Sequence, residues 1–201
     1  MGKPMKIYDN IQEIVKDDMV TTISKGSKVS IAAACFSMYA YKELKKQLDS
    51  VDEFRFIFTS PTFTKEKASK AKREFYIPRL SRETSLYGTE YEIKLRNEMT
   101  QKAIARECAD WIRKKATFKS NITGENMGGF MTVDAPAEQV AYMPIGGFTT
   151  VDIGCERGNN SYNMVNRMEA PFSIQYMQLF ETLWNDKTKM QDVTEEIIES
   201  I

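Results

Sequence analysis

The sequence contains no histidine among its 201 residues, and this absence excludes every mechanism in which imidazole is the nucleophile, general acid or metal ligand. Its three cysteines, Cys35, Cys108 and Cys155, are far apart and form no C-x-x-C pair, so neither a disulfide framework nor a thiolate zinc site is predicted. No stretch approaches the roughly 18 apolar residues of a membrane span, and the N-terminus lacks the apolar core of a signal peptide. We therefore expect a cytoplasmic protein without a membrane partner.

Composition and length predict one globular domain spanning residues 1–201. Hydrophobic residues make up 42% and charged residues 28%, spread over the whole chain. The 28 basic and 28 acidic side chains balance but are unevenly placed: residues 65–119 hold 15 basic and 8 acidic side chains, and residues 120–201 hold 4 and 12. Such a basic block is either a nucleic-acid face or a set of solvated side chains on exposed helices.

The hydrophobic pattern predicts an α/β fold with a mixed, largely parallel sheet flanked by helices. Apolar residues recur every three or four positions in four helical segments, at 10–25, 91–115, 172–184 and 193–201. Short apolar runs predict strands at 28–36, 54–59, 116–119, 129–133, 139–143 and 162–168. Between the first two strands, Ser37 is expected to cap a helix, which makes a βαβ unit with accessible loops at 36–37 and 59–64.

A basic cluster lies in a segment that we expect to be partly loop or insertion, residues 65–90. Phe75 and Tyr76 are interleaved with its cations, a mixture that suits phosphate contacts and occasional base stacking. The predicted nucleic-acid-binding residues are Lys65, Lys67, Lys70, Lys72, Arg73, Arg79 and Arg82. The predicted helix that follows would extend this surface through Lys102, Arg106, Arg113 and Lys114, unless Glu98 and Glu107 pair with them across helical turns.

Three stretches together resemble one family. They are IAAACFS at 31–37, ECADWIR at 107–113 and YMQLFETLW at 176–184. In this order they resemble the phospholipase D-like domain at the N-terminus of bacterial Snf-type helicases. The resemblance implies a phospholipase D-like fold, a homodimer, and a chain that is the N-terminal piece of a larger helicase-like protein.

The resemblance also locates the superfamily's H-x-K-x-x-x-x-D motif, whose positions fall at Met127, Gly129 and Asp134. In the superfamily the histidine attacks phosphorus and the lysine binds the phosphoryl oxygens. Here only the aspartate matches, and the Gly-Ser-x-Asn-type phosphate loop of the family is replaced by Pro144–Thr149. We therefore assign no catalytic residue and interpret Asp134 as a strand-end carboxylate.

These observations favour a catalytically degenerate accessory domain of a Snf-type DNA helicase that contributes DNA contact, dimerisation or both. No cofactor is expected in this domain, because no phosphate-cradling G-x-x-x-x-G-K-[ST] motif is present; ATP and Mg²⁺ would belong to the helicase region. Two alternatives stay open. One is an active nuclease or phosphodiesterase in which Asp134, Asp152 and Glu156 hold a divalent metal. The other is a pure protein-interaction domain.

Overall fold

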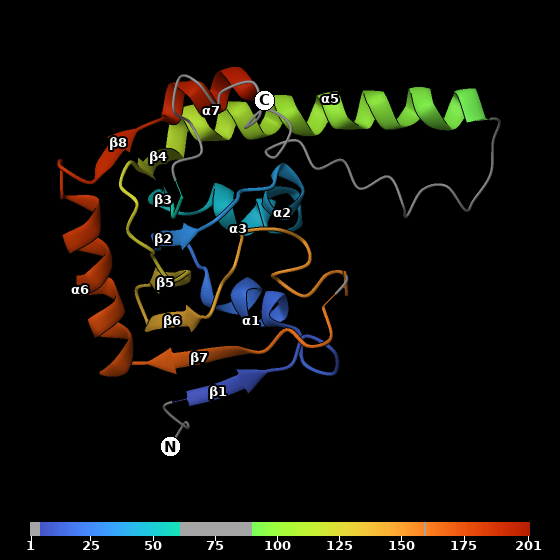
Figure 1. Ribbon diagram of the computed structural model, residues 1–201. Helices are drawn as coiled ribbons and strands as arrows, with labels where there is room; N and C mark the ends of the chain where they lie inside the picture. Colours follow the sequence, from blue (N-terminus) through green and yellow to red (C-terminus); the bar gives the residue numbers. More distant parts are fainter. Residues whose placement is uncertain (1–4, 61–89, 159) are drawn as a thin grey trace.

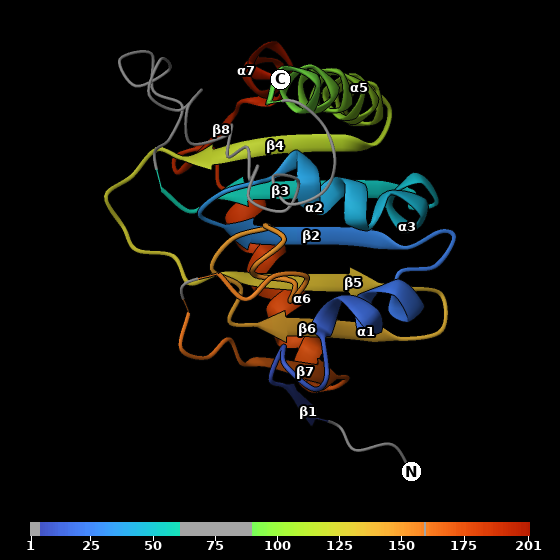
Figure 2. The same cartoon turned by 90° about the vertical axis from the view of Figure 1, so that its right-hand side faces the viewer.

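Eight strands form a single sheet with helices against both faces (Figures 1 and 2). The computed structural model describes residues 5–60, 90–158 and 160–201, and only the backbone of residues 90–100. The strands are β1 (Met5–Tyr8), β2 (Lys28–Ala33), β3 (Glu53–Phe58), β4 (Ala116–Asn121), β5 (Phe130–Asp134), β6 (Gln139–Met143), β7 (Val165–Glu169) and β8 (Met190–Asp192). The helices are α1 (Val15–Thr22), α2 (Met38–Glu43), α3 (Lys45–Asp49), α5 (Glu90–Lys115), α6 (Phe172–Trp184) and α7 (Thr194–Ser200). The predicted α/β class is confirmed.

The sheet is mixed, but it is mainly antiparallel, so the expectation of a largely parallel sheet is wrong. Its order is β1-β7-β6-β5-β2-β3-β4-β8. β3 pairs in parallel with β2 and β4, whereas the other described pairings are antiparallel. Parallel neighbours require a crossover of about a dozen residues or more, and the short turn from β5 to β6 permits only a hairpin.

The βαβ unit of β2, α2, α3 and β3 has the predicted order and parallel strands, but two short helices that meet at Leu44 stand where one helix was expected. The Ser37 side chain accepts a hydrogen bond from the Tyr39 amide at 3.1 Å, which caps α2 as expected. The long helix α5 docks onto this unit, because the Trp111 indole donates to the Leu48 carbonyl oxygen at 2.9 Å. Helix and strand positions in this half of the fold therefore follow the sequence pattern closely.

Helix α1 begins five residues later than its hydrophobic pattern predicts. The Asp9 carboxylate accepts hydrogen bonds from the backbone amides of residues 11–13 at 2.9–3.0 Å, which folds this stretch into a turn. Asn10 has a φ of 56° in that turn, and its side-chain oxygen accepts from the Val15 amide at 2.8 Å. The helix accordingly starts at Val15.

The main hydrophobic core lies between the sheet and α1, α2, α3, α5 and α7. At its centre, phenylalanine rings lie 4.8–6.2 Å apart, a separation at which aromatic pairs attract each other. They are Phe36, Phe54, Phe56, Phe58, Phe118 and Phe148. Cys108 is fully buried in this core, and burial raises the pKa of its thiol.

The opposite face of the sheet is covered by α6 (Figure 1), whose bounds match the predicted helix. Beneath α6 lies a smaller hydrophobic cluster formed by Ala32, Ile57, Phe130, Phe180 and Met190. We call the face of the sheet that α6 covers the back face. Of the described helices, none combines the length and the apolar composition that crossing a membrane requires.

Candidate functional site

Three segments meet at the edge of the sheet where β2 ends. Cys35 and Ser37 follow β2, Gly129 precedes β5, and the loop 144–149 follows β6. Backbone hydrogen bonds connect this loop to both neighbours, from the Phe148 amide to the Cys35 carbonyl at 2.8 Å and from the Ile145 amide to the Gly129 carbonyl at 3.0 Å. The carboxyl ends of parallel strands are the usual place for sites in α/β sheets, so this edge is the candidate site.

The three positions that correspond to the H-x-K-x-x-x-x-D motif do not lie together. Met127 packs against the hydrophobic cluster beneath α6, and Gly129 directly precedes β5. Asp134 ends the same strand and lies opposite Lys28, the first residue of β2. Five residues of extended chain separate Asp134 from Gly129, a distance of about 16 Å. At the candidate edge, these positions therefore supply no nucleophile and no cation.

Gly129 leaves no space for a side chain. A Cβ atom at this position would lie 1.7 Å from the Ile145 carbonyl oxygen and 3.3 Å from the Ala32 carbonyl oxygen. Both neighbours are backbone atoms held in place by the sheet and by the 144–149 loop, so they cannot rotate away as a side chain would. A lysine does not fit here unless the loop moves.

Asp152 is an acidic side chain that the structure does place at this edge. Its carboxylate accepts a hydrogen bond from the Thr149 hydroxyl. A Cβ atom at Gly147 would lie 2.6 Å from Cys35 Sγ and 2.8 Å from Asp152 Oδ2, so the thiol and the carboxylate both approach this glycine. Burial raises the pKa of Asp152, although hydrogen bonds from Thr149 and from backbone amides oppose the shift. These local contacts fix the loop after β6.

The carboxylates that formed the alternative metal site are spread over two edges of the sheet. Asp134 lies beside Lys28, the first residue of β2, whereas Asp152 lies near Cys35, which follows the last residue of β2. Seven residues separate Lys28 from Cys35, and an extended chain of that length spans about 23 Å. Where side chains are described, no three His, Cys, Asp or Glu residues are grouped so that they could hold a metal ion. Asp134 and Asp152 therefore cannot hold the same metal ion, and the alternative that joins both of them with Glu156 in one site is wrong.

The predicted nucleic-acid-binding cluster, Lys65, Lys67, Lys70, Lys72, Arg73, Arg79 and Arg82, lies outside the described residues. Its expected extension on α5 is described. Lys102, Arg106 and Arg113 are exposed, and their spacing of four and seven residues places them on one side of the helix. We call these three residues the α5 basic stripe; it is about 16 Å long.

Among the described side chains, one acid forms an ion pair with the α5 basic stripe. Arg113 pairs with Asp110 at 2.9 Å, and both side chains are more than half exposed, so this ion pair contributes little to stability. Lys114 is also exposed, whereas the Lys115 ammonium donates to the Val51 carbonyl at 2.8 Å. No ion pair between described side chains joins Glu107 to a basic residue of α5. The Glu98 side chain is not described, so its pairing stays untested.

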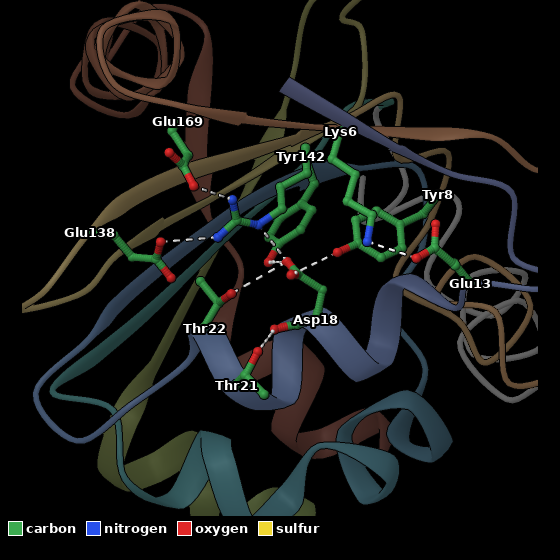
Figure 3. Close-up of polar contacts among 10 residues, drawn as sticks. Lys6, Tyr8, Glu13, Asp18, Thr21, Thr22, Glu138, Tyr142 and Glu169 are labelled. Carbon is green, nitrogen blue, oxygen red and sulfur yellow. Dashed lines mark hydrogen bonds and ion pairs between the residues drawn. The ribbon is translucent and has the colours of Figure 1, made fainter. Parts of the chain in front are cut away.

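A second polar cluster, which the sequence did not reveal, surrounds Asp18 of α1 (Figure 3). The Asp18 carboxylate accepts hydrogen bonds from the Tyr8 hydroxyl at 2.9 Å, the Tyr142 hydroxyl at 2.6 Å and Arg167 Nε at 2.7 Å. The only available signal was a charged residue between the buried positions Val15 and Met19 of an amphipathic helix. The cluster joins α1 to β1, β6 and β7.

Arg167 makes the Asp18 cluster a closed network. Its guanidinium also donates to two glutamates, at 2.8 Å to Glu169 and 3.0 Å to Glu138. Burial alone would lower the pKa of Arg167, but the hydrogen bond to Glu169 and the charge of Asp18 raise it above its usual value. Because these groups satisfy one another, we assign the cluster a structural role.

A comparison with models of known protein families found no match, and a comparison with curated proteins found none either.

Proposed function

We propose that this chain is a catalytically degenerate phospholipase D-like domain of a bacterial Snf-type helicase, and that it contacts DNA without cleaving it. The observation that carries the proposal is the close packing of backbone atoms around Gly129. The resemblance assigns the lysine of the motif to this position, and the backbone around Gly129 excludes even a β-carbon. In this proposal, ATP and Mg²⁺ act in the helicase region and not in this domain.

Loss of cleavage follows from the chemistry of the motif positions. Phosphoryl transfer through a covalent intermediate requires a nucleophile and donors that stabilise charge on the phosphoryl oxygens. The thioether of Met127 is not nucleophilic enough to replace imidazole, and it packs in an apolar cluster. Gly129 provides no ammonium group, and Asp134 lies at the other end of the strand. The barrier reduction by these groups, several kcal/mol each, is therefore missing.

DNA contact is supported by the α5 basic stripe. Phosphate contacts by Lys and Arg supply most of the sequence-independent affinity for DNA. Lys102, Arg106 and Arg113 are exposed side chains on one side of a helix, an arrangement that can follow a phosphate backbone.

The test compares two triple variants with the same change in charge. The first replaces Lys102, Arg106 and Arg113 by Gln; the control replaces Lys25, Lys42 and Lys46, which are also exposed, by Gln. Affinity for duplex DNA is measured by fluorescence anisotropy at several salt concentrations. We expect the stripe variant to bind at least about tenfold more weakly. We also expect the slope of log affinity against log salt concentration to become shallower by about 3, because three phosphate contacts are removed. Equal losses in both variants would refute a role for the stripe.

A homodimer is the second part of the proposal. It is favoured by apolar side chains left half-exposed on the back face at β1 and at the start of α6: Met5 46%, Ile7 50% and Phe172 48%. Sedimentation velocity of the wild type and of Ile7→Asp tests it. We expect a wild-type dimer and a shift towards monomer in the variant; a wild-type monomer at all concentrations would exclude the dimer.

A further inference from the structure

The back face of the sheet has an apolar half beneath α6 and a polar half beside it. The polar half is hollowed into a cavity of about 330 Å³. Its lining comes from β2, β3, β5 and α6: Lys28, Ser30, Glu53, Arg55, Thr132, Asp134, Met177, Phe180 and Glu181. This volume is at the lower end of the range for small-molecule sites, so it suits a ligand of amino-acid size.

Strand register arranges the polar side chains in two rows across the sheet. In the row at the sheet edge, Lys28 lies between Glu53 and Asp134; in the next row, Ser30 lies between Arg55 and Thr132. Cross-strand neighbours on one face are close enough for their groups to act on a single ligand. The rows therefore present carboxylates and an ammonium group at the edge, and two hydroxyl groups and a guanidinium farther in.

Arg55 forms the fixed floor of the cavity. It donates to Ser30 Oγ at 3.1 Å, makes an ion pair with Glu181, and lies 5.0 Å from the Phe180 ring centre. The Arg55 hydrogen bond lowers the pKa of Glu181. These contacts use the terminal nitrogen Nη2 of Arg55, whereas Arg55 Nε lies 3.9 Å from Glu53 Oε1, too far for a hydrogen bond, and is available to a ligand.

Thr132 and Lys28 are available for a ligand. Thr132 and Lys28 line the cavity, and no hydrogen bond joins the Thr132 hydroxyl to a described residue. The buried donor of the lining that lacks a hydrogen-bond partner among the described residues is Arg55 Nε. Because buried polar groups are nearly always hydrogen-bonded, Arg55 Nε indicates a missing acceptor in this cavity. Lys28 lies between two carboxylates in register, yet no ion pair joins it to a described acid within 4.0 Å.

We infer that this cavity binds a small zwitterion of the α-amino acid class. The ligand carboxylate accepts from Arg55 Nε, with the Thr132 hydroxyl and the Lys28 ammonium group as further donors, and the ligand ammonium group donates to Asp134. A simple anion would meet three carboxylates, Glu53, Asp134 and Glu181. A simple cation would leave the buried Arg55 Nε without an acceptor. The site is independent of the DNA contact proposed for α5.

The first experiment measures thermal unfolding of the full chain with each of the standard amino acids. A ligand present at ten times its dissociation constant raises the melting temperature of a protein of this size by about 3 °C or more. We expect at least one amino acid to do so, and expect acetate and methylammonium, which each carry one of the two charges, to bind at least tenfold more weakly. If no amino acid raises the melting temperature, or acetate binds equally well, the inference is wrong.

Variants then locate the binding. Lys28→Met, Asp134→Asn and Thr132→Val each remove one contact and should weaken binding at least tenfold, whereas Thr132→Ser keeps the hydroxyl and should retain it. Matched controls are Lys25→Met and Asp52→Asn, exposed residues outside the cavity lining. The melting temperature of each free variant shows that it folds. Equal binding by cavity and control variants would place the ligand elsewhere.

Discussion

Gly128 and Gly129 are adjacent glycines with opposite tolerance for a side chain. A Cβ atom at Gly128 meets nothing within 4 Å, whereas one at Gly129 would lie 1.7 Å from the Ile145 carbonyl oxygen. We expect Gly129→Ala to lower the free energy of unfolding by at least about 2 kcal/mol, because the backbone must shift, and Gly128→Ala to change it by less than about 0.5 kcal/mol. Urea denaturation measures both. Similar effects would show that the strand has room for the motif lysine.

Asp17 and Asp18 provide a second residue-scale comparison. Both lie in the first turn of α1, but Asp17 is exposed, whereas the Asp18 side chain is 13% exposed and bonded to Arg167. Asp18→Ala should cost about 3 kcal/mol of unfolding free energy, because two tyrosine hydroxyl groups and a buried guanidinium lose their acceptor. Asp17→Ala should cost less than about 1 kcal/mol. If thermal denaturation showed equal losses, the network would not stabilise the fold.

At the scale of elements, α6 depends on one anchoring side chain. Phe180 is 1% exposed in the back-face cluster, whereas its neighbour Leu179 is 45% exposed. We expect Phe180→Ala to destabilise the protein by about 3–5 kcal/mol through the cavity it leaves, and Leu179→Ala by less than about 1 kcal/mol. Chemical denaturation followed by tryptophan fluorescence is suitable, since Trp184 stacks on Phe180 at 5.7 Å. The reverse order of effects would contradict the orientation of α6.

The sequence predicted the long helices and the central strands well but missed the two shortest strands. Segments 91–115 and 172–184 are long enough for a three- to four-residue period to be unambiguous, and the structure confirms both helices. Strands β1 and β8 have four and three residues, too few for a pattern, and neither was predicted. The start of α1 was placed too early because the Asp9 turn also contains apolar residues at helical spacing.

Site prediction from the sequence was limited because strands that pair in the sheet are far apart along the sequence. Polar residues alternate with apolar ones at Lys28 and Ser30, and at Thr132 and Asp134, which indicates a polar sheet face. That these pairs lie opposite each other depends on β2 pairing with β5, about 100 residues later, and no local pattern encodes this pairing. Likewise, Asp134 and Asp152 are close in sequence but lie near opposite ends of strand β2.

At the scale of the whole molecule, we expect stability to fall in alkaline solution. Burial raises the pKa values of Cys108, Tyr41 and Tyr142 in the folded protein. In the unfolded chain a thiol ionises near pH 8.5 and a phenol near pH 10. Above those values the folded state retains protons that the unfolded state releases, so the free energy of unfolding falls by up to about 1.4 kcal/mol per pH unit for each group.

Urea denaturation between about pH 8 and pH 11 measures this slope. Tyr41→Phe removes one of the three groups and should make the slope shallower, whereas Tyr162→Phe, at a residue that is 78% exposed, should not. A free energy of unfolding that stays constant or rises over this range would contradict the account.

The central claim, a domain that contacts DNA but has lost phosphodiester cleavage, is tested most directly by one measurement on the wild-type chain. Fluorescence anisotropy follows binding to single- and double-stranded DNA from about 50 to 300 mM salt, with and without magnesium, and the same samples are examined for cleavage. We predict binding that weakens steeply with salt and leaves the DNA intact. Cleavage would contradict the loss of catalysis, and absence of binding would contradict the DNA contact.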